Sequence, residues 1–142
     1  MRRELALLTA LGGLLAVARA EPDAALIAQG RQVYVAEGCM HCHSQYVRPG
    51  TADEERYGAP RPLAELEQQR PPLFGNRRQG PDLQNVGSRR PSEWLRLQLQ
   101  APRTVMPGSR MPAYGHLFAN GRADGDALVA YLLSLREPEP RG

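Results

Sequence analysis

The chain has 142 residues, of which 18 are basic and 15 are acidic, so its formal net charge at pH 7 is +3. A chain of this length can bury one hydrophobic core but not two independent ones. The small charge excess argues against a nucleic-acid-binding protein, which needs many more basic residues to displace counterions from phosphates. We therefore expect one small domain.

The first 20 residues carry the three parts of a secretory signal peptide. Arg2 and Arg3 precede an apolar run from Leu5 to Val17, and Ala18-Arg19-Ala20 follows as an A-x-A cleavage pattern. The run has 13 residues, whereas a helix needs about 20 apolar residues to cross a bilayer. We expect cleavage after Ala20, which removes three arginines and one glutamate and lowers the net charge from +3 to +1. An uncleaved membrane anchor is the alternative.

A first helix is predicted directly before the two cysteines of the chain. Asp23 is a good N-cap, apolar residues recur from there towards Glu37, and Gly38 is a typical helix end. Cys39 and Cys42 therefore follow the end of a helix.

The stretch from Arg48 to Pro81 is rich in Pro, Gly, Arg and Glu, and its prolines break any long periodic pattern. Within it only Leu63 to Gln69 is predicted to form a short helix. The sequence then predicts a helix that opens at Pro91 and Ser92, runs through Leu99 and is stopped by Pro102.

The last predicted helix starts at Asp124, and its apolar residues recur at helical spacing. They are Leu128, Val129, Tyr131, Leu132 and Leu135. No alternating strand pattern of useful length occurs, so the fold class predicted is all-α. Three modest helices and more than thirty residues of Pro-rich loop bury little apolar surface. We therefore expect a large apolar cofactor to complete the core.

Arginines are concentrated between residues 77 and 110, where only Asp82 and Glu93 oppose them. The seven arginines are Arg77, Arg78, Arg89, Arg90, Arg96, Arg103 and Arg110. This cluster is interpreted as a solvated face, as a docking surface, or as a set of counterions for a buried anionic group.

The stretch from Cys39 to His43 reads C-M-H-C-H, the C-x-x-C-H signature of covalent haem attachment. In this chemistry two thiols add to the vinyl groups of the porphyrin, and the imidazole of the next residue binds the iron. The predicted cofactor is therefore one covalent haem c with its iron, held by Cys39, Cys42 and His43. His41 is interpreted as a solvent-facing spacer.

Three other interpretations of the cysteine pair remain open. A redox dithiol would need a strand-helix context, which the pattern does not provide. A structural disulfide fits an exported chain but leaves His43 without a role. A zinc site usually has a second paired cluster, which is missing here. Its ligands would come from Cys39, Cys42, His41, His43 and His116.

The iron of such a haem needs a sixth ligand or an open site, and the segment VMPGSRMPAYGH offers candidates. They are Met106, Met111 and His116. A thioether ligand favours reduced iron and raises its potential. Both methionines are followed by proline, so the residues alone do not choose between them.

Several stretches together resemble a known family. They are GRQVYVAEGCMHCHSQYVRP at 30–49, ERYG at 55–58, RQGPDLQNVG at 78–87, and a run with Trp94, Pro-Arg at 102–103 and SRMPAY at 109–114. In order and spacing they are similar to the mono-haem cytochrome c subunit of cbb-type (C-family) haem-copper oxidases, over about residues 30–117. The last helix resembles that of class I cytochromes c. The fold implied has a few helices around one haem and a long Pro/Arg-rich loop between the haem motif and the GPDL stretch.

The resemblance assigns roles to single positions. Cys39 and Cys42 would form the thioether bonds, and His43 would be the proximal ligand. Met111 would be the distal ligand in preference to Met106. The backbone carbonyl of Pro81 would accept a hydrogen bond from the proximal imidazole, which orients such a ring.

Other matched positions would lie near the haem edge or in the core. Arg48, Trp94 and Arg103 match positions near the haem propionates, since guanidinium and indole N–H groups can donate to carboxylates. Simple core packing is the alternative for Trp94. Tyr34 and Tyr131 are expected where the first and last helices cross.

Three functions remain in competition. Members of the resembled family normally have a membrane-spanning helix before the haem domain, and this chain has only the run from Leu5 to Val17. We therefore place first an exported periplasmic cytochrome that carries single electrons in a respiratory chain and is not itself an enzyme. The second is a bound, membrane-attached subunit of a cbb-type oxidase or related complex that faces the periplasm. The third is a c-haem sensor or enzyme with an open distal site.

The expected organisation is a signal peptide at 1–20, a cytochrome domain at 21–136 and a polar tail at 137–142. The expected partners are other redox proteins, such as a terminal oxidase or a quinol-oxidising complex. Contact with the membrane would come only through an uncleaved N-terminus or a partner.

Overall fold

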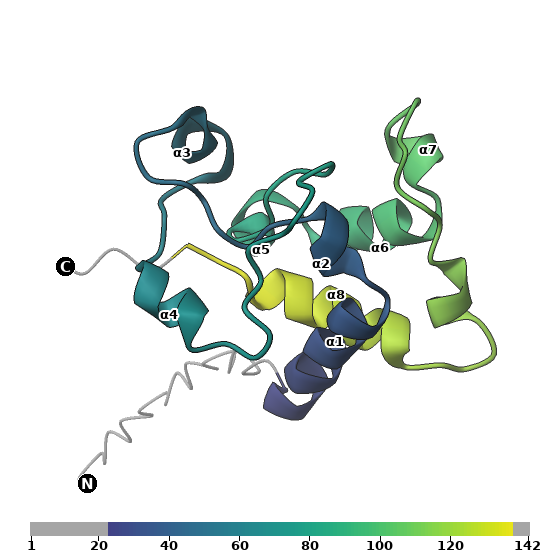
Figure 1. The fold of residues 1–142 in the computed structure, drawn as a ribbon. Coiled ribbons are helices and arrows are strands. Elements are labelled where there is room, and N and C mark those ends of the chain that lie inside the picture. The colour runs from purple at the N-terminus through teal and green to yellow at the C-terminus, as the bar shows by residue number, and fades with distance from the viewer. Residues whose placement is uncertain (1–22, 138–142) are drawn as a thin grey trace, which may run out of the picture.

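The computed structural model describes residues 23–137 (Figure 1), so the expected signal peptide and most of the polar tail lie outside the described residues. The described part is all-helical, as predicted. Its elements are α1 (Ala24–Ala36), α2 (Cys39–Cys42), α3 (Ala52–Tyr57), α4 (Leu63–Glu67), α5 (Val86–Arg89), α6 (Ser92–Gln100), α7 (Pro102–Val105), the 3-10 helix η1 (Gly115–Phe118) and α8 (Asp124–Ser134). Among these helices we find none with the length and apolar character needed to span a membrane.

The core forms where α1 crosses α8, two helices from opposite ends of the chain (Figure 1). A Cβ atom on Gly30 would lie 1.9 Å from the carbonyl oxygen of Ala127, so the two backbones approach closely because residue 30 has no side chain. The buried rings of Tyr34 and Tyr131 meet edge to face with centroids 5.6 Å apart. The predicted position of both tyrosines is confirmed.

Both ends of α1 have the caps that its sequence predicts. The side chain of Asp23 accepts hydrogen bonds from the backbone N–H groups of Ala25 and Leu26, at 2.9 and 3.4 Å. Gly38 has a φ of +71°, in the left-handed region that glycine adopts at little cost. The turn at Gly38 ends α1 and starts α2, so the position of the cysteines depends directly on this cap.

The Pro/Arg-rich stretch between the haem motif and the GPDL stretch contains more helix than its sequence predicts. Two short helices, α3 and α4, form there, and only α4 was predicted. The side chain of Thr51 caps α3 by accepting from the N–H of Asp53 at 3.2 Å. Leu66 and Leu73 from this stretch are buried in the core. The stretch is therefore a packed part of the domain.

Amide side chains attach this stretch to the residues that follow the GPDL motif. Asn85 donates to the carbonyls of Tyr57 and Ala59, both at 3.0 Å. Gln84 donates to the carbonyl of Ala59 at 2.8 Å. These bonds satisfy backbone groups that a loop would otherwise leave unpaired.

Pro102 has a second role that the prediction did not include. The helix predicted from Pro91 is present as α6, and it ends at Gln100. Pro102, predicted only as a stop, is also the first residue of the unpredicted helix α7. Proline fits there because the first N–H groups of a helix have no intrahelical partner. The short helices α5 and η1 were not predicted either.

Candidate haem site

Helix α2 carries both cysteines of the C-x-x-C-H motif. Cys39 is buried, with 8% of its surface exposed, whereas Cys42 is partly exposed. Both thiols are free, so the disulfide interpretation is not supported by the structure. Burial raises the pKa of Cys39 to about 12, which keeps this thiol protonated at neutral pH. Cys42 Sγ lies 3.8 Å from Oε1 of Gln79.

The imidazole of His43 is oriented by the backbone of the GPDL stretch. Its Nδ1 lies 2.8 Å from the carbonyl oxygen of Pro81, to which an Nδ1–H group donates. Burial lowers the pKa of His43 and favours the neutral ring, the form that binds metals. With Nδ1 bonded in this way, Nε2 is the ring nitrogen left to bind iron. The contact predicted between Pro81 and His43 is present in the structure.

Gly80 allows the GPDL stretch to approach this ring. A Cβ atom at residue 80 would lie 2.2 Å from Cε1 and 2.6 Å from Nδ1 of His43. The N–H of Gly80 also donates to the carbonyl of Cys42 at 2.9 Å. Sequence analysis did not single out Gly80, although a glycine directly before the matched Pro81 was an available signal.

The two candidate methionines lie in different environments. Met106 has 57% of its surface exposed, whereas Met111 packs against the hydrophobic core. The sulfur of Met111 lies 3.3 Å from Nε2 of Gln98 on α6. The structure thus places one thioether at the core and the other at the surface.

The segment that carries Met111 lies beside the cysteine motif and is held to α6. The N–H of Tyr114 donates to the carbonyl of Leu99 at 2.7 Å. Burial raises the pKa of Tyr114 to about 12. Nε2 of His116, two residues further along this segment, lies 3.2 Å from the carboxylate of Glu37, just before the cysteine motif. The attachment motif and the Met111 segment are therefore neighbours.

Arg48 forms an ion pair within its own segment. Its Nε and Nη2 atoms lie 2.6 and 3.0 Å from the carboxylate oxygens of Asp53. Arg78 contacts the same carboxylate at 3.0 Å and also donates to Ser44 and to the carbonyl of Tyr46. This network, Arg48–Asp53–Arg78, connects the start of α3 to the residues that follow His43. The role of Arg48 beside a propionate stays a prediction.

Trp94 packs against the core, whereas Arg103 contacts the segment that carries Met111. Trp94 is partly buried against the core, and the guanidinium of Arg90 stacks 4.5 Å above its ring. Arg103 donates from Nε to the carbonyl of Ser109 at 3.4 Å, so it contacts the segment that carries Met111. Their predicted proximity to propionates is not tested by these contacts.

Several arginines of the 77–110 cluster have partners inside the domain. Arg89 donates to the carbonyl of Asp82 at 2.7 Å and lies 5.2 Å from the ring centre of Tyr57. Arg96 pairs with the carboxylate of Asp126. Arg78 is part of the network with Asp53. The cluster is thus not one uniform docking surface.

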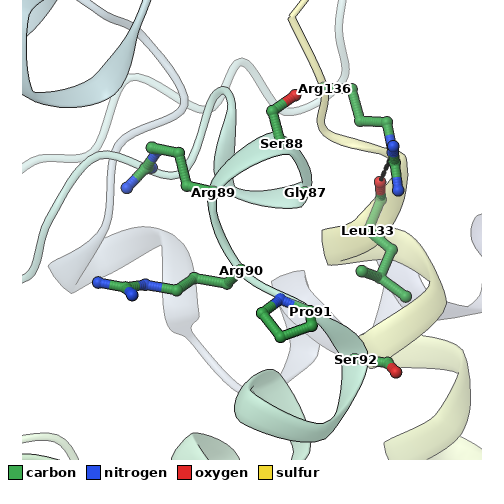
Figure 2. Close-up of a pocket in the computed structure, with 8 residues that line it drawn as sticks. All are labelled: Gly87, Ser88, Arg89, Arg90, Pro91, Ser92, Leu133 and Arg136. Carbon is green, nitrogen blue, oxygen red and sulfur yellow. Dashed lines mark hydrogen bonds between the residues drawn. The ribbon is translucent and has the colours of Figure 1, made fainter.

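An open hollow of about 420 Å³ lies between α5, the start of α6 and the end of α8 (Figure 2). Figure 2 shows the side chains of Arg89 and Arg90 extending away from Leu133 and Arg136 on the other side. Neither the cysteine motif nor the Met111 segment contributes a residue to its lining. We therefore do not assign this hollow to the haem.

The zinc interpretation lacks a ligand set in the structure. Within residues 23–137 no three His, Cys, Asp or Glu side chains gather as a metal site would require. His116 lies 3.2 Å from the carboxylate of Glu37. By contrast, two free thiols, an imidazole with one oriented nitrogen and a core thioether fit the donor set of a c-type haem.

A comparison with protein families agrees with this donor set. The sequence model described as cytochrome c oxidase, mono-heme subunit/FixO matches residues 13–137. The match includes the cysteine motif, the GPDL stretch and the Met111 segment. No curated protein matched the chain. Because the family match covers most of the sequence, the chain belongs to the FixO family of mono-haem cytochrome c oxidase subunits.

Proposed function

We propose that this chain is the periplasmic electron-transfer subunit of a cbb-type terminal oxidase, which passes single electrons through one covalent haem. The observation that carries the proposal is the hydrogen bond from His43 to Pro81, next to two free thiols on α2. Family membership favours the bound subunit, placed second by sequence, over a freely diffusing carrier.

The chain holds the haem through four side chains in this proposal. Cys39 and Cys42 would form the thioether bonds, and His43 through Nε2 and Met111 through its sulfur would bind the iron. When bound, the haem supplies a one-electron couple between ferrous and ferric iron. The chain transfers no proton or atom, and it needs no catalytic residue of its own.

The protein's part is to keep both ligands in place in the two oxidation states. The Pro81 carbonyl fixes the tautomer and orientation of His43, and such a contact also raises the basicity of a ligand. Gly80 gives the backbone room to pass close to the ring. The core position of Met111 supports its choice over Met106, whose side chain is exposed.

Haem staining of native gels tests this function. The chain is expressed in cells that attach c-type haem, together with the other oxidase subunits, and periplasmic and detergent-solubilised membrane fractions are compared. We expect a haem-positive band in a large membrane complex. A small haem-positive band in the soluble fraction would instead establish the diffusing carrier.

A cysteine variant provides the control. Replacing Cys39 and Cys42 together by alanine should remove the denaturant-resistant haem stain while the protein band remains detectable by antibody. Absence of haem from the unmodified protein would reject the cytochrome assignment. A five-coordinate iron in the unmodified protein would support the open-site sensor or enzyme instead.

A further inference from the structure

Gln98 contacts the sulfur of Met111 from the preceding helix. Its amide nitrogen Nε2 lies 3.3 Å from Sδ, within hydrogen-bond distance for a sulfur acceptor. Gln98 is partly buried on α6, next to the buried Leu99. The contact joins α6 to the segment after α7 that carries Met111.

The orientation of this amide is set by chemistry. A thioether sulfur is a weak acceptor and has no proton to donate, so only the NH₂ group of Gln98 can bond to it. The other end of the amide, Oε1, is buried and has no hydrogen-bond partner among the described residues. A buried carbonyl without a partner costs free energy. An apolar residue of similar size would avoid this cost, so stability of the fold is a poor explanation for Gln98.

We propose that Gln98 is a positioning residue for the distal ligand, holding the Met111 thioether and tuning the iron that it binds. The inference rests on the proposed ligation by Met111. A thioether sulfur has two lone pairs. If the Gln98 N–H occupies one, the other is directed to the iron and the sulfur has less freedom to swing away.

The same bond has an electronic consequence. The positive end of an N–H dipole at the sulfur disfavours the additional positive charge of ferric iron. Gln98 should therefore raise the reduction potential, in the same direction as the thioether ligand itself. Loss of the bond should lower the potential and make the distal ligand easier to displace.

The test uses the haem-loaded protein with two variants and a matched control. Gln98→Leu removes the amide, and Gln98→Glu keeps its shape but cannot donate when ionised. The control is Gln100→Leu, the same substitution at an exposed position on the same helix. Three properties are measured: the midpoint potential, the affinity of the ferric protein for added imidazole, and thermal unfolding.

We expect both Gln98 variants to have a lower midpoint potential than the control and to bind imidazole about two- to tenfold more tightly, the range that one net hydrogen bond supplies. Gln98→Leu should unfold at no lower temperature than the control. A merely structural Gln98 would give the reverse pattern, with lower unfolding temperature and unchanged potential. If Gln98→Leu yields no holoprotein, Gln98→Glu decides the test.

Failure of this inference can be distinguished from failure of the proposed ligation. The charge-transfer band of a ferric thioether-ligated haem reports whether Met111 binds iron. If Met111→Ala abolishes the band and both Gln98 variants behave like Gln100→Leu, the ligation stands and the role of Gln98 is rejected. If Met111→Ala leaves the band intact, both the ligation and the role of Gln98 are rejected.

Discussion

At the scale of single residues, the proposed haem site depends on Met111 and Gly80. Met111 is the methionine that packs against the core, and Gly80 is the residue whose missing side chain admits the ring of His43. Replacing either residue by alanine should therefore have a measurable effect on the holoprotein.

Met111→Ala should remove the distal thioether. We expect loss of the low-spin ferric spectrum and a lower midpoint potential, because the soft sulfur ligand stabilises reduced iron. Visible absorption spectroscopy and a redox titration of the holoprotein measure both. The matched control is Met106→Ala, which removes an exposed methionine. If Met106→Ala changes the spectrum and Met111→Ala does not, the assignment of the ligand is wrong.

Gly80→Ala should disturb the proximal side. A Cβ atom 2.2 Å from Cε1 of His43 forces the ring or the backbone to move, and such overpacking typically costs about 1–3 kcal/mol. We expect a lower free energy of unfolding and an altered ferrous spectrum, measured by denaturant titration and absorption. Gly115→Ala is the control, since a Cβ there meets only Gln100 at an ordinary distance of 3.9 Å. Equal stability of the two variants would contradict the close approach.

At the scale of elements, the domain depends on two contacts that bring distant segments together. The first is the crossing of α1 and α8 at Gly30. The second is the network in which Arg48 and Arg78 bind Asp53 at the start of α3. The first joins the helix before the cysteine motif to the last helix, and the second joins residues just after the motif to Arg78.

Gly30→Ala should push α1 away from α8. The added methyl group would lie 1.9 Å from the carbonyl oxygen of Ala127, a backbone atom that cannot turn aside. We expect the free energy of unfolding to fall by about 1–3 kcal/mol or more. Gln32→Ala, on the exposed side of α1, should change it by less than about 0.5 kcal/mol. Denaturant titrations of the two proteins compare these values, and a smaller loss for Gly30→Ala would contradict the packing.

The Asp53 network should make stability depend on pH. Hydrogen bonds from Arg48 and Arg78 lower the pKa of Asp53 to about 2, below the ordinary value of about 3.9. Because this pKa is lower in the folded state, the contribution of Asp53 to the free energy of unfolding is complete above pH about 4. It is lost as the pH falls towards 2. The stability difference between the unmodified protein and Asp53→Asn should therefore shrink across this window.

Thermal unfolding at several pH values measures the effect of Asp53→Asn. The control is Asp126→Asn, which breaks a pair with Arg96 that is exposed on both sides and should contribute little. A constant difference between the unmodified protein and Asp53→Asn from pH 5 to pH 2 would show that the network does not lower the pKa of Asp53.

At the scale of the whole molecule, the domain is small and is built mostly from short helices. Among the described helices, the most extensive contact joins α1 and α8. A small domain of this kind needs an additional source of buried apolar surface. In the proposed function the haem supplies it, and the chain works within a larger oxidase.

Intact mass spectrometry of the mature holoprotein tests the organisation of the chain. We expect a mass that corresponds to a start at Glu21 plus one covalently attached haem, because the first 20 residues have the features of a cleaved signal peptide. A protein that retains its first 20 residues would support the uncleaved anchor. A mass without haem would contradict covalent attachment.

Local patterns were enough to predict much of the fold and the proximal half of the site. Asp23 and Gly38 delimit α1, and the periodic apolar residues of α8 mark a helix, because caps and helical faces depend on nearby residues. The C-x-x-C-H motif likewise specifies its chemistry within five residues. The resemblance to a family added Pro81, whose contact with His43 the structure contains.

Other features required the tertiary structure. The network around Asp53 includes Arg78, which is 25 residues away in sequence. The different environments of Met106 and Met111 depend on how the chain returns to α6, since both are flanked by the same residue type in sequence. The contact from Gln98 to Met111 has no local signal either. Sequence by itself thus determined the longer helices and the chemistry of attachment, whereas three-dimensional packing decided which side chains meet, because those contacts join residues that no local pattern connects.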